Sequence, residues 1–214
     1  MEAIEHVDQL HNHWWWRPGW HAGRHFYACH ITLDDQPDLR RLAATYQGAL
    51  ADLDGLDLIP AEWLHMTLHG VGFVDQVSPG DADAVLRAVS EAVAGVQPPT
   101  VTFGQVVVRP EAVYLPAEPA APLVGLRDAV HSALVEMLGA DRVEPLGGYR
   151  PHMSVAYANR DQPAAPIVAA LEGARVEPVE VTVRRLSWLV FHRDYQMYQW
   201  TDRTPIPLGP AQAT

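Results

Sequence analysis

Hydrophobic and polar positions divide the chain into short segments whose period alternates between two and about 3.6. Alternation over residues 25–33 predicts a strand, and apolar residues recur at helical spacing from Leu39 to Leu53, after a cap region at 34–36. Further strands are predicted over residues 63–68, 100–108, 112–115, 150–157 and 179–192, with a return strand over 195–200. Further helices are predicted over residues 81–94, 123–138 and 167–171. Strands and helices do not alternate as regularly as in a parallel-sheet protein, and this order predicts an α+β fold.

The two ends of the chain differ from the rest. Residues 1–24 are rich in His and Trp without a clear period, which predicts an irregular arm. Pro205, Pro207 and Pro210 indicate a tail over residues 205–214. With 214 residues and 48% hydrophobic content the chain is long enough to bury a core, and we expect residues 1–214 to form a single bilobal domain.

A repeated tetrapeptide organises the chain. His-Met-Thr-Leu at 65–68 recurs as His-Met-Ser-Val at 152–155, an offset of 87 residues (152 minus 65). The same offset carries the strand before the first copy onto the run that starts at Val113, and the first helix onto the third. A third match begins at His30, but the offset takes it to Ala117. The two mated copies therefore predict a pseudo-two-fold, two-lobed fold.

The spacing within each copy suits phosphodiester chemistry. Side chains two apart on a strand share a face, so His65 lies beside Thr67 and His152 beside Ser154. Two imidazoles with unperturbed pKa values of about 6.5 can serve as general base and general acid near neutral pH. The hydroxyls can donate to phosphate oxygens, where charge gathers in the transition state. These four residues are the predicted catalytic set, and the scheme needs no metal or cofactor.

The paired motifs, with Pro151 before the second, resemble those of the 2H phosphoesterase superfamily. The layout from Arg24 to Trp200 is similar to its branch called bacterial 2′-5′ RNA ligase or RNA 2′,3′-cyclic phosphodiesterase, and Arg24-His25-Phe26-Tyr27-Ala28 resembles that branch's first strand. The resemblance implies antiparallel sheets around a central cleft with helices outside. It also implies opening of 2′,3′-cyclic phosphates to 2′-phosphates and, in some members, reversible 2′-5′ ligation. The sequence departs from the pattern of that family at His69, after the first motif, and in the His/Trp-rich arm. Both departures concern the identity of the substrate more than the chemistry.

Residues near the motifs are candidates for substrate contact. By the two-residue rule, Trp63 and Arg150 share faces with their histidines. Trp63 could stack on a base and Arg150 could pair with phosphate, or they could serve lobe packing and a surface ion pair. Because the other face of the first strand is more apolar, Phe26 and His30 are expected to face the cleft, where His30 contacts substrate or is structural.

Four further positions complete the candidates. His69 lies two strand steps beyond Thr67 and is expected on the same face. The Tyr149 hydroxyl could reach the substrate, although packing is the alternative. Tyr195 and Tyr198 could border the cleft or pack on the last strand.

Composition excludes several classes of protein. The formal charge is -11, from 15 basic against 26 acidic residues, so binding to duplex DNA is not expected. All the basic residues are Arg, which excludes Schiff-base and P-loop lysines. The single cysteine, Cys29, excludes an internal disulfide and is expected to be a buried hydrophobe. No apolar run reaches membrane-spanning length, and we expect a cytoplasmic monomer acting on a nucleotide or RNA end with a cyclic or 2′-5′ phosphate.

Three hypotheses follow for the function. The first is the cyclic phosphodiesterase with His65 and His152 as its proton-transfer groups. The second is a module on the same fold that binds a nucleotide or RNA end without turning it over. The third is a metal-dependent enzyme built on the arm and its neighbourhood, with ligands drawn from His11, His13, His21 and His25.

Overall fold

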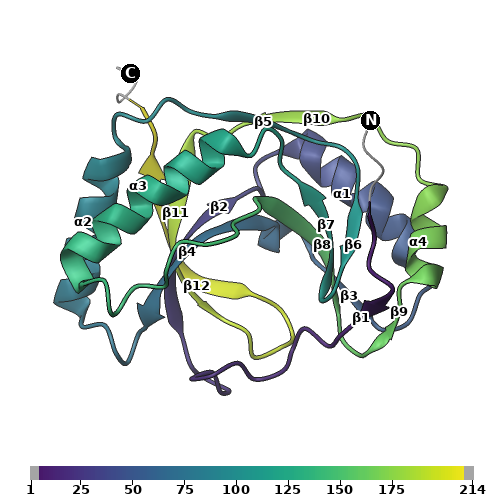
Figure 1. Ribbon diagram of the computed structural model, residues 1–214, viewed down its shortest axis with the longest axis horizontal. Coiled ribbons are helices and arrows are strands. Elements are labelled where there is room, and N and C mark those ends of the chain that lie inside the picture. The colour runs from purple at the N-terminus through teal and green to yellow at the C-terminus, as the bar shows by residue number, and fades with distance from the viewer. Residues whose placement is uncertain (1–4, 210–214) are drawn as a thin grey trace.

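Two four-stranded antiparallel sheets form the protein, whose computed structural model describes residues 5–209 (Figure 1). The first sheet has the order β12-β11-β2-β4, with bounds Gln199–Pro207, Arg185–His192, Phe26–Thr32 and His65–Phe73. The second has the order β3-β8-β7-β6, with bounds Leu56–Leu58, His152–Ala158, Ala112–Pro116 and Val107–Arg109. Four helices accompany them in the described chain: α1 (Pro37–Leu50), α2 (Pro79–Val93), α3 (Ala121–Leu138) and α4 (Ala165–Glu172). The α+β prediction is confirmed.

The repeat predicted from the sequence corresponds to these elements. The offset of 87 carries β2, α1 and β4 onto β7, α3 and β8, and the two motif strands begin at His65 and His152. In each half the motif strand pairs antiparallel with the first strand of its own repeat, β4 with β2 and β8 with β7. Each repeat is therefore a strand–helix–strand unit whose two strands share a sheet.

The helices cross between the halves. Helix α1 follows β2 of the first sheet but packs against β8 of the second and against α4. Helix α3 follows β7 of the second sheet but packs against β4 of the first and against α2 (Figure 1). Each sheet is thus covered by a helix from the other repeat. Because of this exchange, neither repeat can bury its own apolar face alone.

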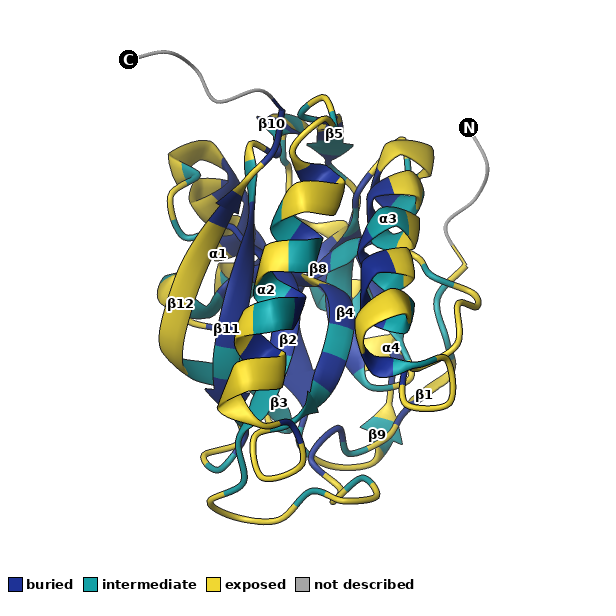
Figure 2. Cartoon of the chain, turned by 90° about the vertical axis from the view of Figure 1, so that its left-hand side faces the viewer, coloured by how far each residue is buried: buried dark blue, intermediate teal, exposed yellow. Residues whose placement is uncertain are grey.

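The amphipathic patterns explain how the helices attach. The residues of α1 that recur at helical spacing are its buried face: Leu39, Leu42, Ala43, Tyr46 and Leu50. Proline stands in the first turn of each of the four helices, where its missing N–H costs no intrahelical bond. Figure 2 shows α2 and α3 with exposed outer faces and buried faces against the sheet. Hydrophobic burial therefore fixes the helices to the outer sides of the sheets, away from the space between them.

Two predicted long strands are each broken in the structure. The run over 100–108 forms β5 (Thr100–Phe103) and β6, and the run over 179–192 forms β10 (Val179–Thr182) and β11. Strands β5 and β10 pair with each other in a separate two-stranded sheet. The breaks occur because the chain passes from one sheet to another, a tertiary feature that alternation along the sequence does not reveal.

The prediction of a tail from residue 205 is wrong for its first part. Pro205 and Pro207 lie within β12, opposite Ser187 and Arg185 of β11. Strand β12 is the edge of its sheet, where a residue without an N–H can be accommodated. Pro210 lies outside the described residues.

The N-terminal arm is more ordered than predicted. The half of the protein that contains the first sheet is called the first lobe, and the half that contains the second sheet is called the second lobe. Strand β1 (Gln9–Leu10) pairs antiparallel with β9 (Gln162–Pro163) at the edge of the second lobe. Leu10 and Trp14 are buried, whereas Trp15 and Trp16 are about half exposed. The arm is therefore attached to the body by main-chain pairing and by two of its apolar side chains.

Two expectations concern single residues and membrane crossing. Cys29 is fully buried in β2, and burial raises the pKa of its thiol to about 12, which keeps it protonated and unreactive. None of the helices among the described residues has the length and hydrophobicity to cross a membrane.

Helix α3 offers a matched test of this packing. The sequence places both Leu126 and Met137 on its apolar stripe, but Leu126 is 1% exposed and Met137 42% exposed. We expect Leu126→Ala to lower the free energy of unfolding by about 2–5 kcal/mol, because it leaves a cavity under α3. Met137→Ala should change it by no more than about 0.5 kcal/mol. Urea unfolding of both variants measures this, and equal effects would contradict the assigned burial.

Candidate active site

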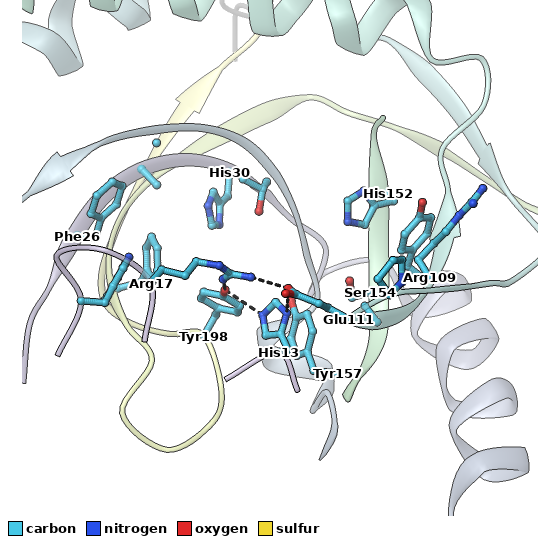
Figure 3. Close-up of a pocket in the computed structure, with 18 of the residues that line it drawn as sticks. His13, Arg17, Phe26, His30, Arg109, Glu111, His152, Ser154, Tyr157 and Tyr198 are labelled. Carbon is cyan, nitrogen blue, oxygen red and sulfur yellow. Dashed lines mark hydrogen bonds and ion pairs between the residues drawn. The ribbon is translucent and has the colours of Figure 1, made fainter. Parts of the chain in front are cut away.

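A cleft of about 530 Å³ lies between the two lobes (Figure 3). Strands β2, β4 and β11 contribute to one side, and β7 and β8 to the other. The predicted site residues that line it are Phe26, His30, Thr67, His152 and Ser154. Side chains from both motifs therefore face one cavity, as the two-lobed arrangement requires.

Both motif histidines are oriented by their own main chain. His65 donates from Nδ1 to the Trp63 carbonyl at 2.7 Å, and His152 donates from Nδ1 to the Arg150 carbonyl at 2.7 Å. A carbonyl oxygen only accepts, so Nδ1 carries the hydrogen in each ring. In the neutral ring Nε2 then has its lone pair free. The two imidazoles have the same tautomer and the same free nitrogen.

Each histidine is also stacked on a ring from the neighbouring strand. His30 of β2 stacks on His65 with centroids 4.8 Å apart and planes at 6°. Tyr114 of β7 lies against His152 with centroids 4.2 Å apart and planes at 30°. His30 pairs across the ladder with Thr67, and Tyr114 with Ser154. Tyr114 is therefore the structural counterpart of His30, a correspondence that the offset of 87 misses.

The two histidines differ in exposure. His65 is 7% exposed and lies beneath His30, with the rings of Tyr198 and Trp200 each 5.9 Å from it. His152 is half-buried and lines the cleft directly. His65 is not among the side chains that line the cleft. Its Nδ1 is hydrogen-bonded, whereas its Nε2 has no hydrogen-bond partner in the described part of the chain. The first histidine is thus held deeper than the second.

Burial changes the titration of both rings. It lowers the pKa of His65 to about 4, against an opposing effect of the Trp63 carbonyl, and the nearby His152 lowers it further. Burial likewise lowers the pKa of His152, opposed by the Arg150 carbonyl. The expectation of unperturbed values is therefore wrong. At neutral pH both imidazoles of the free protein are uncharged.

The N-terminal arm contributes three side chains to the cleft, His13, Arg17 and Trp20. His13 contacts the Tyr198 hydroxyl through Nε2 at 3.0 Å and the Glu111 carboxylate through Nδ1 at 3.0 Å. Arg17 donates to the same two partners, at 2.9 Å to Tyr198 and 2.6 Å to Glu111 (Figure 3). The arm, the β11–β12 loop and the β6–β7 turn therefore meet at one end of the cleft.

Comparison with known proteins agrees with this arrangement. Residues 35–195 match the family model of the 2′-5′ RNA ligase superfamily. The chain belongs to that superfamily. Among curated proteins no sequence matches. Membership supports phosphoesterase or ligase activity without fixing the reaction.

Solved structures of low sequence identity share the fold. The protein TT0787 of Thermus thermophilus matches with a TM-score of 0.62 at 18% identity, over 86% of this chain and 97% of that one. Escherichia coli LigT, solved in complex with NADP+ and in complex with 3′-AMP, matches with a TM-score of 0.59 at 16% identity, over 86% of this chain and 98% of that one. The predicted 2H phosphoesterase fold is confirmed.

Two predicted binding residues of this superfamily member act through their main chain. Trp63 lies in a 3-10 turn before β4, and its ring packs on Trp200 at 4.7 Å, outside the cleft. Arg150 precedes β8, and its side chain is exposed and does not line the cleft. The two-residue rule fails because neither residue is in a strand. Their carbonyls orient His65 and His152.

His69 is turned away from the cleft by a β-bulge. The register of β2 and β4 shifts between Cys29 and His30, so Thr67 pairs with His30 while His69 pairs with Cys29. The extra residue reverses the alternation, and Gly70 takes the cleft-facing place. His69 is buried against α3, with its Nε2 3.1 Å from Nδ1 of His131. The prediction that it shares the His65 face is wrong.

Tyr149, just before the second motif, is hydrogen-bonded to the strand of the first motif. Its hydroxyl donates to the Thr67 carbonyl at 3.0 Å, and the Arg127 guanidinium lies over its ring at 5.0 Å. It is not among the residues that line the cleft. The structure thus favours the packing alternative for Tyr149. Tyr198 lines the cleft, whereas Tyr195 is 77% exposed.

The four histidines of the metal hypothesis have separate partners. His13 binds Glu111 and Tyr198, His11 lies near Asp161, His21 contacts the Ala22 carbonyl, and His25 packs on His192. Among residues 5–209, no three His, Cys, Asp or Glu side chains gather closely enough to hold a metal ion. Nothing in this part of the chain supports a metal site on the arm.

Buried neutral histidines should make the protein sensitive to acid. Burial lowers the pKa of five of them: His13 (to about 3), His30, His65 (to about 4), His69 and His152. Between pH 6.5 and pH 4 the unfolded chain binds protons that the folded protein does not, so stability is complete above pH 6.5 and falls as the pH drops. Each ring contributes up to about 1.4 kcal/mol per pH unit. Urea unfolding at pH 8, 6 and 5 measures the slope.

A variant isolates one of these rings. His30→Phe keeps an aromatic ring against His65 but removes a buried group that titrates on unfolding. The slope of stability against pH should decrease by up to about 1.4 kcal/mol per pH unit. An unchanged slope, or a wild type equally stable at pH 8 and pH 5, would contradict the assignment of these histidines as buried and neutral.

Proposed function

We propose that this protein is a metal-independent phosphoesterase that opens 2′,3′-cyclic phosphates of nucleotides or RNA ends. One observation carries the proposal: His65 and His152 are each fixed through Nδ1 by a carbonyl, with Nε2 free, on motif strands from the two sides of one cleft. Two such nitrogens are what an in-line displacement at phosphorus needs, one to remove a proton and one to supply a proton.

In the proposed reaction one imidazole takes a proton from water through Nε2. The water oxygen forms a bond to phosphorus while the bond from phosphorus to the 3′-oxygen breaks. The second imidazole, which is protonated, gives its Nε2 proton to the departing 3′-oxygen. The products are a 2′-phosphate and a free 3′-hydroxyl. If a 5′-hydroxyl attacks in place of water, the same steps give a 2′-5′ linkage.

Thr67 and Ser154 both line this cleft. In this scheme they donate hydrogen bonds to the non-bridging phosphate oxygens, which gain charge as the attacking bond forms. Their positions two residues beyond each histidine place one donor beside each proton-transfer group. The phosphate would therefore be held from both lobes at once.

Binding of the substrate can favour the protonated form of the histidine that acts as the acid. Both rings are neutral in the free protein because burial lowers their pKa values. A phosphate anion within a few ångströms favours the protonated form and raises the pKa of the ring that carries the proton. Binding and protonation are thus coupled, and the acid is charged when the substrate is in place.

The relatives support a nucleotide substrate. E. coli LigT, which shares the fold, has been solved with 3′-AMP and with NADP+. The cleft also carries aromatic rings that can stack on a base, including Phe26, Trp20 and Phe191. Its volume lies within the range of about 300–1,000 Å³ typical of small-molecule sites.

Alanine variants of both histidines test the proposal. His65→Ala and His152→Ala should each lower kcat on a nucleoside 2′,3′-cyclic phosphate by about 10²–10⁴, the contribution of one general acid or base. Turnover is followed by phosphorus NMR, which also reports which oxygen keeps the phosphate. In excess EDTA the wild-type rate should not change.

His21→Ala is the matched control, since His21 is exposed and does not line the cleft. It should retain the wild-type rate. Full activity in both motif variants would refute the proposal. A wild type that binds the nucleotide but forms no product would favour the binding module instead.

The lowered pKa values also predict the pH profiles. For kcat/KM, which reports the free protein, the required mixed protonation state becomes scarcer as the pH rises above the lowered values. We expect kcat/KM to decrease with pH from below pH 6.5 upward. The optimum of kcat should lie at higher pH, because bound phosphate raises the pKa of the acid. A kcat/KM that rises between pH 6.5 and pH 8 would contradict this.

A further inference from the structure

We infer that Arg109, which lines the cleft, is a specificity residue that binds a second phosphate of the substrate, one ribose away from the phosphate that reacts. The inference rests on the proposed function, because it adds a contact to the same site. The second phosphate is carried on the 5′-oxygen, either as a terminal monoester or as the diester to a preceding nucleotide. Arg109 therefore favours substrates with this phosphate over those that have a 5′-hydroxyl.

Arg109 is the last residue of β6, at the edge of the second sheet. Its neighbour Val108 is fully buried, and because side chains alternate along a strand, Arg109 points to the opposite face, where it lines the cleft. Its partner across the β6–β7 turn is Ala112, which also lines the cleft and whose short side chain leaves room over β7. The fold thus directs an arginine side chain into the cleft from the second lobe.

The main chain that carries Arg109 is fixed on both sides. On one side β6 pairs with β7. On the other side runs the N-terminal arm: the Val7 N–H donates to the Val108 carbonyl at 3.2 Å, and the His11 N–H donates to the Pro110 carbonyl at 2.6 Å. A ligand that binds Arg109 therefore does not have to order this strand first, which reduces the entropic cost of binding.

Arg109 differs from the other arginines in the combination of its burial and its lack of a partner. Its side chain donates no hydrogen bond and forms no ion pair within residues 5–209, and its Nε is buried without an acceptor there. All fifteen basic residues of the sequence are arginines that lie in this range. The others that lack a partner within it are exposed to solvent: Arg40, Arg87, Arg150, Arg175 and Arg184. Arg109 is half-buried and thus withdrawn from water without an acceptor of its own.

The other arginine that lines the cleft already has partners. Arg17 donates to the Tyr198 hydroxyl at 2.9 Å and to the Glu111 carboxylate at 2.6 Å, and this carboxylate neutralises its charge. Glu144 also lines the cleft, but no ion pair joins it to Arg109 in the described part of the chain. Of the two arginines in the cleft, Arg109 is therefore the one whose charge is available to a ligand.

The sheet register places Arg109 beside the site of the reacting phosphate. Ser154 of β8 pairs with Tyr114 of β7. Tyr114 pairs in turn with Val107, two residues before Arg109 on β6. Neighbouring strands lie about 4.8 Å apart, so β6 is roughly 10 Å from the strand of His152 and Ser154. Figure 3 shows Arg109, His152 and Ser154 on the same side of the cleft. This displacement fits a group on the far side of the ribose that bears the reacting phosphate.

A phosphate supplies what the Arg109 guanidinium lacks. The group is always charged, and its N–H donors match two oxygens of one phosphate. In a partly buried cleft the attraction between them is screened less than at the surface. The protein as a whole has a formal charge of -11 and repels anions, so a preference for a second phosphate depends on a local contact of this kind.

Calorimetry with three ligands tests the inference without requiring turnover. The ligands are adenosine 2′-phosphate, adenosine 2′,5′-bisphosphate, and a 3′-5′-linked diadenylate with a 2′-phosphate on its last ribose. The wild type should bind the second and third ligands at least about fivefold more tightly than the first. Arg109→Met should remove this preference and change the Kd of adenosine 2′-phosphate by less than about threefold.

Arg87→Met is the matched control. It removes an exposed arginine of α2 that does not line the cleft, so it changes the net charge by the same amount. It should keep the wild-type preference. Arg109→Gln, which retains a polar side chain without the charge, provides the same test if Arg109→Met does not fold.

The outcomes are distinct. Equal affinities of the wild type for all three ligands, or a preference that the Arg109 variants preserve, would overturn the inference. A uniform loss of affinity for all three ligands would also overturn it, and would place Arg109 at the reacting phosphate or against the base. Tighter binding of the bisphosphate alone assigns the contact to a terminal monoester, whereas tighter binding of both ligands extends it to the diester of an RNA chain. Because the readout is binding, a failure of this inference and a failure of the proposed catalysis are seen separately.

Discussion

The exchange of helices between the two repeats holds both sheets in position and thereby creates the cleft. Helix α1 leaves the first sheet to cover the second, and α3 leaves the second to cover the first. Both sheets bury their outer faces this way, because the helices lie on the outer sides of the sheets (Figure 1). Residues of both sheets line the cleft between them. The two motif strands, β4 and β8, then contact each other near the middle of the protein. A site that uses one histidine from each motif strand requires this contact.

Main-chain geometry determines the orientation of the two imidazoles. Each Nδ1 donates to the carbonyl two residues earlier, so the identity of the side chain at that position is not what fixes the ring. The stacked partners then differ between the halves, an imidazole for His65 and a phenol for His152. Burial makes both rings neutral, which costs stability in acid but leaves Nε2 able to accept a proton. The symmetry is therefore closest in the main chain and weakest in the surrounding side chains.

The two repeats and the N-terminal arm contribute different side chains to the cleft. The repeats supply the predicted catalytic groups, while the arm supplies His13, Arg17 and Trp20. Arg17 enters a cleft that also contains Glu111, and the two side chains form an ion pair. In a chain with a formal charge of -11 and no lysine, the side chains that can bind a phosphate are hydroxyls, imidazoles and arginine. The same composition suits a small anionic ligand better than a long one.

The repeat, the α+β class and the placement of Thr67, His152 and Ser154 on the cleft could all be predicted from the sequence, because strand alternation and a fixed offset are local properties. Trp63, Arg150 and His69 could not be placed in this way: the first two precede their strands, and a bulge beside Thr67 turns His69 toward α3. The pattern also gave no sign that Tyr114 is the counterpart of His30, since the connections within the two repeats differ in length. That Glu111 gathers His13, Trp15 and Arg17 is visible only in the folded protein, because contacts nearly 100 residues apart depend on how the lobes and the arm pack.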